Sequence, residues 1–161
     1  MLKVVPNRAD VSAPSPEPGL PWASALNATT EHADISVTLL ALAVAGDVMR
    51  VTGLVQIRGR STVRIATIPT LQVATPDGAV MRLLDAHMRP SGAVSWLSWT
   101  YERPGVVPGR LGARIEQIEI EHMLGGATQE GVVGPWTFQF AVHPPTPGAA
   151  ATPSDDGAGR A

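Results

Sequence analysis

Cysteine is absent from this chain of 161 residues. Without cysteine there is no disulfide framework, no thiolate metal site and no cysteine nucleophile, so a small disulfide-rich secreted scaffold is excluded. Lysine occurs once against eleven arginines, and the net charge is -2, with neither sign gathered in blocks. This charge pattern does not indicate binding to nucleic acid or to an anionic membrane surface.

Long apolar runs are also missing. The longest, Ile35 to Ala45, is followed by Asp47 and Arg50, and it is far shorter than the roughly 20 residues that cross a bilayer as a helix. Repeated prolines interrupt the segment from Met1 to Trp22, which leaves no apolar core for a secretory signal. The sequence therefore predicts no membrane span, no export and a cytoplasmic location.

Proline and alanine are concentrated at the two ends, and the middle of the chain is apolar. Hydrophobic residues make up 44% of the chain and charged residues 16%, a balance that favours a folded core over general disorder. Closely spaced prolines fix φ and remove backbone donors. We therefore predict a disordered arm over residues 1–28, one folded domain over residues 29–143 and a disordered tail over residues 144–161.

The apolar pattern of the middle has a period of two, which indicates half-buried strands. The clearest strand is the last, where Trp136, Phe138 and Phe140 alternate with polar or small residues. The segment Asp34 to Ala45 changes its apolar phase midway, which a β-bulge or burial on both faces would explain. A short Gly46-Asp47 connection predicts an antiparallel hairpin with the strand that follows.

Four further segments have strand character: Thr70–Thr75, Ala79–Met88, Ala93–Glu102 and Ala113–His122. The first two flank Pro76-Asp77-Gly78, which predicts a second hairpin because proline presets φ and glycine accepts a positive φ. Short strands at this spacing, divided by Gly and Pro turns, predict an all-β fold, an antiparallel β-sandwich of about seven strands.

Three features of the predicted domain are shared with a known class of modules. They are the serial hairpins, the Pro76-Asp77-Gly78 turn and the closing aromatic strand GPWTFQFAV at Gly134 to Val142. In these features the chain resembles immunoglobulin-like and fibronectin-like β-sandwich modules, although the cysteine pair of antibody domains is absent. The resemblance implies an immunoglobulin-like sandwich with a role in adhesion, recognition or scaffolding.

The ionisable residues do not form a catalytic or metal-binding signature. The histidines lack the spacings that aim two imidazoles at one ion, and Asp85 with His87 is the best local pair. Two exposed polar residues are the more common arrangement for such a pair. Glu119 and Glu121 share a strand face and are typical of a solubilising stripe. We predict a protein that is not an enzyme and that has no cofactor and no metal site.

Arg58 and Arg60 belong to the only basic cluster, together with Arg64. Their guanidinium groups could bind a phosphate or a carboxylate through paired donors. The more common alternative is a solvated strand end whose arginines pair with nearby acids. We include Arg58 and Arg60 among the candidate binding residues.

The strand Ala93–Glu102 holds the other candidates, Trp96, Trp99 and Tyr101. Strand alternation places Trp96 on the opposite face from Trp99 and Tyr101, so one set packs in the core while the other lies on an outer face. A bulge or a covering loop that buries all three is the alternative. Exposed Trp and Tyr side chains are favoured anchors for a partner.

These features favour a non-catalytic module that binds another protein or associates with itself, through an aromatic sheet face or a strand edge. The alternative is a module for a small ligand or a carbohydrate, in which Trp99 and Tyr101 stack on a ring and Arg82 or Glu102 orients it. An enzyme is the least favoured of the three classes.

Overall fold

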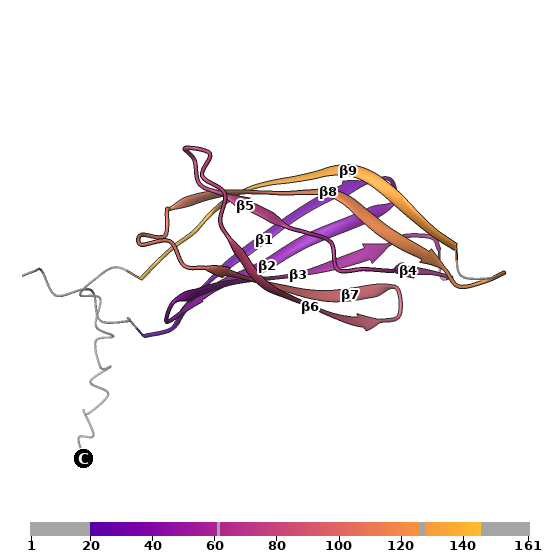
Figure 1. Cartoon of the computed structure of the whole chain (residues 1–161), viewed down its shortest axis with the longest axis horizontal. Helices are drawn as coiled ribbons and strands as arrows, with labels where there is room; N and C mark the ends of the chain where they lie inside the picture. The colour runs from indigo at the N-terminus through magenta and orange to yellow at the C-terminus, as the bar shows by residue number, and fades with distance from the viewer. Residues whose placement is uncertain (1–19, 61, 126–127, 146–161) are drawn as a thin grey trace, which may run out of the picture.

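The computed structural model describes residues 20–60, 62–125 and 128–145, and these residues form an all-β fold of nine antiparallel strands (Figure 1). The strands are β1 (Trp22–His32), β2 (Ile35–Ala45), β3 (Val48–Ile57), β4 (Val63–Ile65), β5 (Gln72–Ala74), β6 (Leu83–Ser91), β7 (Val94–Glu102), β8 (Arg110–His122) and β9 (Thr128–Ala141).

The first sheet contains five strands in the order β1-β2-β3-β7-β6. Two-residue turns join three of its neighbouring pairs. Ala33 and Asp34 have positive φ between β1 and β2, Gly46 has a φ of 56° between β2 and β3, and Gly92 has a φ of 63° between β6 and β7. Positive φ in two-residue turns matches the twist of the strands they connect, so these turns set the register of the sheet.

A β-bulge lies in β2. Leu39 is opposite Gly53 and Ala41 is opposite Thr52, so Leu40 is the extra residue. The bulge brings Ile35, Val37 and Leu39 before it, and Leu42 and Val44 after it, onto the buried face. It is one of the two explanations that the phase change in the sequence left open.

The second sheet is built around β8. β9 pairs with β8 along its whole length, so β4 and β5 share the opposite edge of β8, each at one end. The chain passes from one sheet to the other between β3 and β4, between β5 and β6, and between β7 and β8. Figure 1 shows the resulting two layers, with β8 and β9 in one and β1, β2 and β3 in the other.

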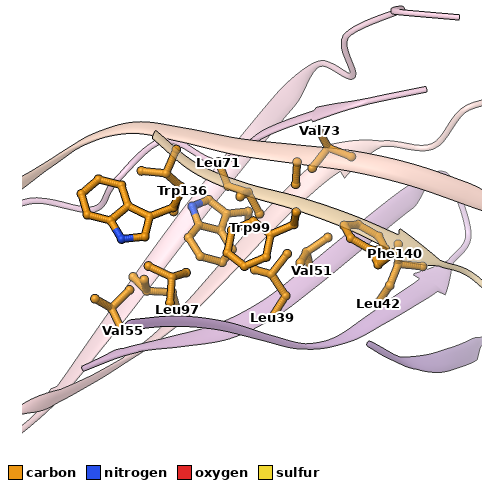
Figure 2. Close-up of a cluster of buried hydrophobic side chains, with 14 of the residues drawn as sticks. Leu39, Leu42, Val51, Val55, Leu71, Val73, Leu97, Trp99, Trp136 and Phe140 are labelled. Carbon is orange, nitrogen blue, oxygen red and sulfur yellow. The ribbon is translucent and has the colours of Figure 1, made fainter. Parts of the chain in front are cut away.

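The hydrophobic core lies between the two sheets and draws on both (Figure 2). The indole of Trp136 on β9 is completely buried, and its Nε1 donates a hydrogen bond of 3.0 Å to the carbonyl oxygen of Ile35 on β2. At the outer strands, Thr30 on β1 donates to the carbonyl oxygen of Thr137 on β9 over 2.8 Å. The sheets are therefore closed along the side where β1 meets β9.

The sequence predicted the all-β class and the antiparallel pairing, and both are confirmed. Two strands were not expected, β1 and β4. Residues 22–28, assigned to a disordered arm, pair with β2. Residues 1–19 of that arm and residues 146–161 of the predicted tail lie outside the described residues.

The predicted hairpin between Thr70–Thr75 and Ala79–Met88 is wrong. The turn itself forms, because the Thr75 amide donates to the carbonyl oxygen of Ala79 over 2.9 Å and Gly78 has a φ of 91°. Past the single bridge between Ala74 and Val80, however, the strands separate. β5 pairs with β8 in the second sheet, whereas β6 pairs with β7 in the first.

Candidate binding surface

Strand β7 divides its aromatic residues between the two faces of the first sheet. Trp99 and Tyr101 are 0% exposed, whereas Trp96 is 48% exposed. The opposite placement expected from strand alternation is therefore correct, and the outer face carries Trp96 alone of the three.

The selection of Trp99 and Tyr101 as binding residues is corrected to a core role. The Trp99 Nε1 donates to the carbonyl oxygen of Pro69 over 2.8 Å, and the Tyr101 hydroxyl donates to the carbonyl oxygen of Leu71. The Trp99 ring lies among buried side chains from both sheets (Figure 2). Tyr101 belongs to the same buried cluster and is 0% exposed, so neither ring has a face left for a ligand. The two residues hold the segment before β5 against the core.

Trp96 lies on the outer face of the first sheet, between Leu54 of β3 and Arg89 of β6 in the strand register. Residues directly opposite each other in a sheet project on the same side. Trp96, Arg89 and Ser91 line a shallow hollow of about 440 Å³. An exposed indole beside a guanidinium group is a typical anchor of protein interfaces.

Strand β6 forms the edge beside this hollow. It is the last strand of its sheet, and among the described residues its only strand neighbour is β7. None of its nine residues is buried, and only Ala86 and Met88 are half-buried against the core. An edge strand of this kind presents unpaired backbone donors and acceptors to solvent, which another strand can pair with.

Asp85 and His87 lie on the outer face of β6, as their spacing predicted. His87 Nε2 is 2.7 Å from Asp85 Oδ2, and both side chains are largely exposed. Within the described part of the chain, no group of three or more His, Asp and Glu side chains is arranged to hold a metal ion. The pair is thus an exposed local contact on the edge strand.

Arg58 and Arg60 follow the end of β3, and the strand does not continue through them because β3 ends at Ile57. Arg58 Nη1 is 3.3 Å from Glu31 Oε2, and Arg64 Nη2 is 2.8 Å from Glu121 Oε2. Pairing with nearby acids is the alternative that the sequence favoured. Arg60 borders a separate small hollow of about 100 Å³ with Asp34 and Glu130, and a binding role for Arg58 or Arg60 stays a prediction.

A pocket that the sequence did not indicate lies beside β5. Its volume is about 440 Å³, and its apolar wall contains Leu71, Val80, Met81 and Leu83. Arg114 and Glu116 of β8 form part of the wall, with Arg114 Nε 2.5 Å from Glu116 Oε1. The apolar run from Ala79 to Leu84 was the available signal, and it was interpreted as part of a hairpin strand.

No protein-family profile, curated protein or solved structure matches this chain. In the part of the chain that the structure describes, no helix has the length and apolar character needed to cross a membrane.

Proposed function

We propose that this protein is a non-catalytic binding or assembly module, built as an immunoglobulin-like β-sandwich, that docks another protein on β6 and the outer face of β7. The two antiparallel sheets and their serial hairpins support the architecture. The observation that carries the function is that β6, the edge strand of a five-stranded sheet, has no fully buried residue.

The chemistry of this surface suits strand addition. A partner strand beside β6 would form backbone hydrogen bonds, which give affinity with little dependence on sequence. Arg89 lies on the edge strand β6, and Trp96 lies opposite it on the neighbouring strand β7. Both side chains would provide the contacts that select the partner. Large rigid side chains next to a free edge supply contact area at a small entropic cost.

The test is photo-crosslinking of the full chain in its native cells, with a photoreactive residue at Ser98. Ser98 lies on the outer face of β7, opposite His87 and two residues from Trp96. We expect a protein adduct whose yield falls sharply when the photoreactive chain also carries Trp96→Ala, because the variant has lost its anchor.

The matched control places the same photoreactive residue at Val133, which is 69% exposed on β9 in the other sheet. Adducts at position 98 that are no more abundant than those at position 133 would contradict the proposal. The same holds if the photoreactive chain with Trp96→Ala forms as much adduct as the photoreactive chain without it.

A second candidate function, binding of a small ligand, is supported by the pocket beside β5. Its apolar wall and its Arg114–Glu116 pair would suit a molecule with an apolar body and a polar end. The version in which Trp99 and Tyr101 stack on a ring is withdrawn because both are buried. Filling the pocket through Met81→Trp would abolish such binding and leave the Trp96-dependent adduct unchanged.

A further inference from the structure

The outer face of β6 carries opposite charges on either side of a histidine. Asp85, His87 and Arg89 are every second residue of β6 and so project from one face. They lie opposite Thr100, Ser98 and Trp96 of β7. Along this face the charge changes from negative at Asp85 to positive at Arg89, and in an antiparallel copy it changes in the opposite direction. An antiparallel copy of the same strand is therefore its electrostatic complement.

The backbone of β6 also fixes which residues can pair across the open edge. The turn at Gly92-Ala93 joins Ser91 to Val94, and residues that flank a two-residue turn exchange hydrogen bonds with each other. Because the direction of the backbone groups alternates, Ala86, Met88 and Pro90 direct theirs to the open edge. Proline has no N–H and is tolerated at such a position. The Ala86 amide already donates to Asp85 Oδ1 over 2.9 Å, so strand pairing at Ala86 requires this contact to be replaced.

We infer that the partner of this edge is a second copy of the same chain, with two β6 strands paired antiparallel about a two-fold axis at His87. This inference rests on the proposed function and names its partner. In this register Ala86 is opposite Met88 of the partner subunit, and Asp85 is opposite Arg89 of the partner subunit. The two first sheets join into one continuous sheet of ten strands, five from each copy.

Neighbouring registers are less favourable. An axis at Met88 places His87 opposite Arg89 of the partner subunit and leaves Asp85 without a cation. An axis at Ala86 leaves Arg89 opposite the apolar Leu83 of the partner subunit. Only the axis at His87 forms an Asp–Arg pair twice.

The two β6 strands can pair over only a short length. The irregular register between Leu83 and Asp85 ends the pairing on one side, and Pro90 ends it on the other. An interface of this size falls in the class of weak, reversible associations. We therefore expect self-association to be seen only at high concentration, from about 10 µM to about 1 mM.

The experiment is sedimentation velocity of the full chain over that range, with charge-reversal variants. Asp85→Arg gives an edge with two cations, and Arg89→Asp gives an edge with two anions. Each variant alone should associate at least tenfold more weakly than the wild type, because like charges face each other across the axis. An equimolar mixture of the two should associate at least as well as the wild type, because each copy complements the other.

The control is Glu31→Arg, an equal charge reversal on β1 at the opposite edge of the same sheet, which should leave self-association unchanged. Thermal unfolding of each variant checks that the fold is retained. Single variants that associate like the wild type, or a mixture that does not associate, would overturn the inference. If the Trp96-dependent adduct contains a different protein while the charge variants have no effect, the inference fails and the proposed function stands.

Discussion

Replacing Trp99 by alanine is expected to lower the free energy of unfolding by about 3 to 5 kcal/mol, as truncation of a fully buried aromatic side chain does. Trp99 is 0% exposed, and its ring lies among buried residues of both sheets. The substitution also removes the donor that satisfies the carbonyl oxygen of Pro69. The segment before β5 would lose one of its two anchors to β7.

Trp96→Ala is the matched control, because it makes the same change three residues away on the same strand. Trp96 is half exposed on the outer face, so we expect its loss to cost about 1 kcal/mol or less. Chemical denaturation of the two variants measures both values. Equal losses of stability for Trp96→Ala and Trp99→Ala would contradict the assignment of one to the surface and the other to the core.

Tyr101 should make the fold sensitive to alkaline pH. Burial raises the pKa of the Tyr101 hydroxyl well above its usual value of about 10. Below pH 10 the hydroxyl is protonated in both the folded and the unfolded chain. Above pH 10 the unfolded chain loses this proton while the folded chain keeps it, so the free energy of unfolding should fall by about 1.4 kcal/mol per pH unit.

This sequence isolates the effect because it contains a single tyrosine and a single lysine. Tyrosinate absorbance therefore reports Tyr101 alone and should appear only as the chain unfolds. In Tyr101→Phe the alkaline slope should largely disappear, although the carbonyl oxygen of Leu71 loses its donor and stability at neutral pH falls by about 1 to 2 kcal/mol. Tyrosinate formed near pH 10 in the folded chain would contradict the burial of this hydroxyl.

Local patterns were sufficient for the strands that bury one face. The alternation through Trp136, Phe138 and Phe140 identified part of β9, and the phase change in β2 indicated a bulge that the structure contains. β1 has few large apolar residues because it is an edge strand. Its second half contacts β9 through the Thr30 hydroxyl and through His32, whose ring packs edge-on against Trp136. Its hydrophobic signal was therefore too weak to separate it from the arm before it.

The error at β5 and β6 has a different cause. The chemistry of Pro76-Asp77-Gly78 predicted a chain reversal, and the chain does reverse there. A turn does not determine which sheet each strand joins, because that choice depends on contacts with β8 and β7, which are distant in sequence. The same crossover creates the pocket beside β5, so the apolar residues from Ala79 to Leu84 did not by themselves predict it.

The candidate surface was predictable in part. Strand alternation separated Trp96 from Trp99 and Tyr101, but it could not say which set faces the core. That depended on the position of the second sheet. The lack of fully buried residues on β6 also depended on its place at the end of the strand order, which no local pattern contains.

Amide hydrogen exchange at Met88 tests whether β6 is an edge that a partner strand covers. The Ala86 amide is a poorer probe because it donates to Asp85 Oδ1 over 2.9 Å. In dilute solution the Met88 amide should exchange rapidly, while the His87 amide, directed toward β7, should be protected. At high concentration, or with a partner bound, the Met88 amide should become protected as well. Protection of the Met88 amide at every concentration, or its rapid exchange under all of these conditions, would contradict the account.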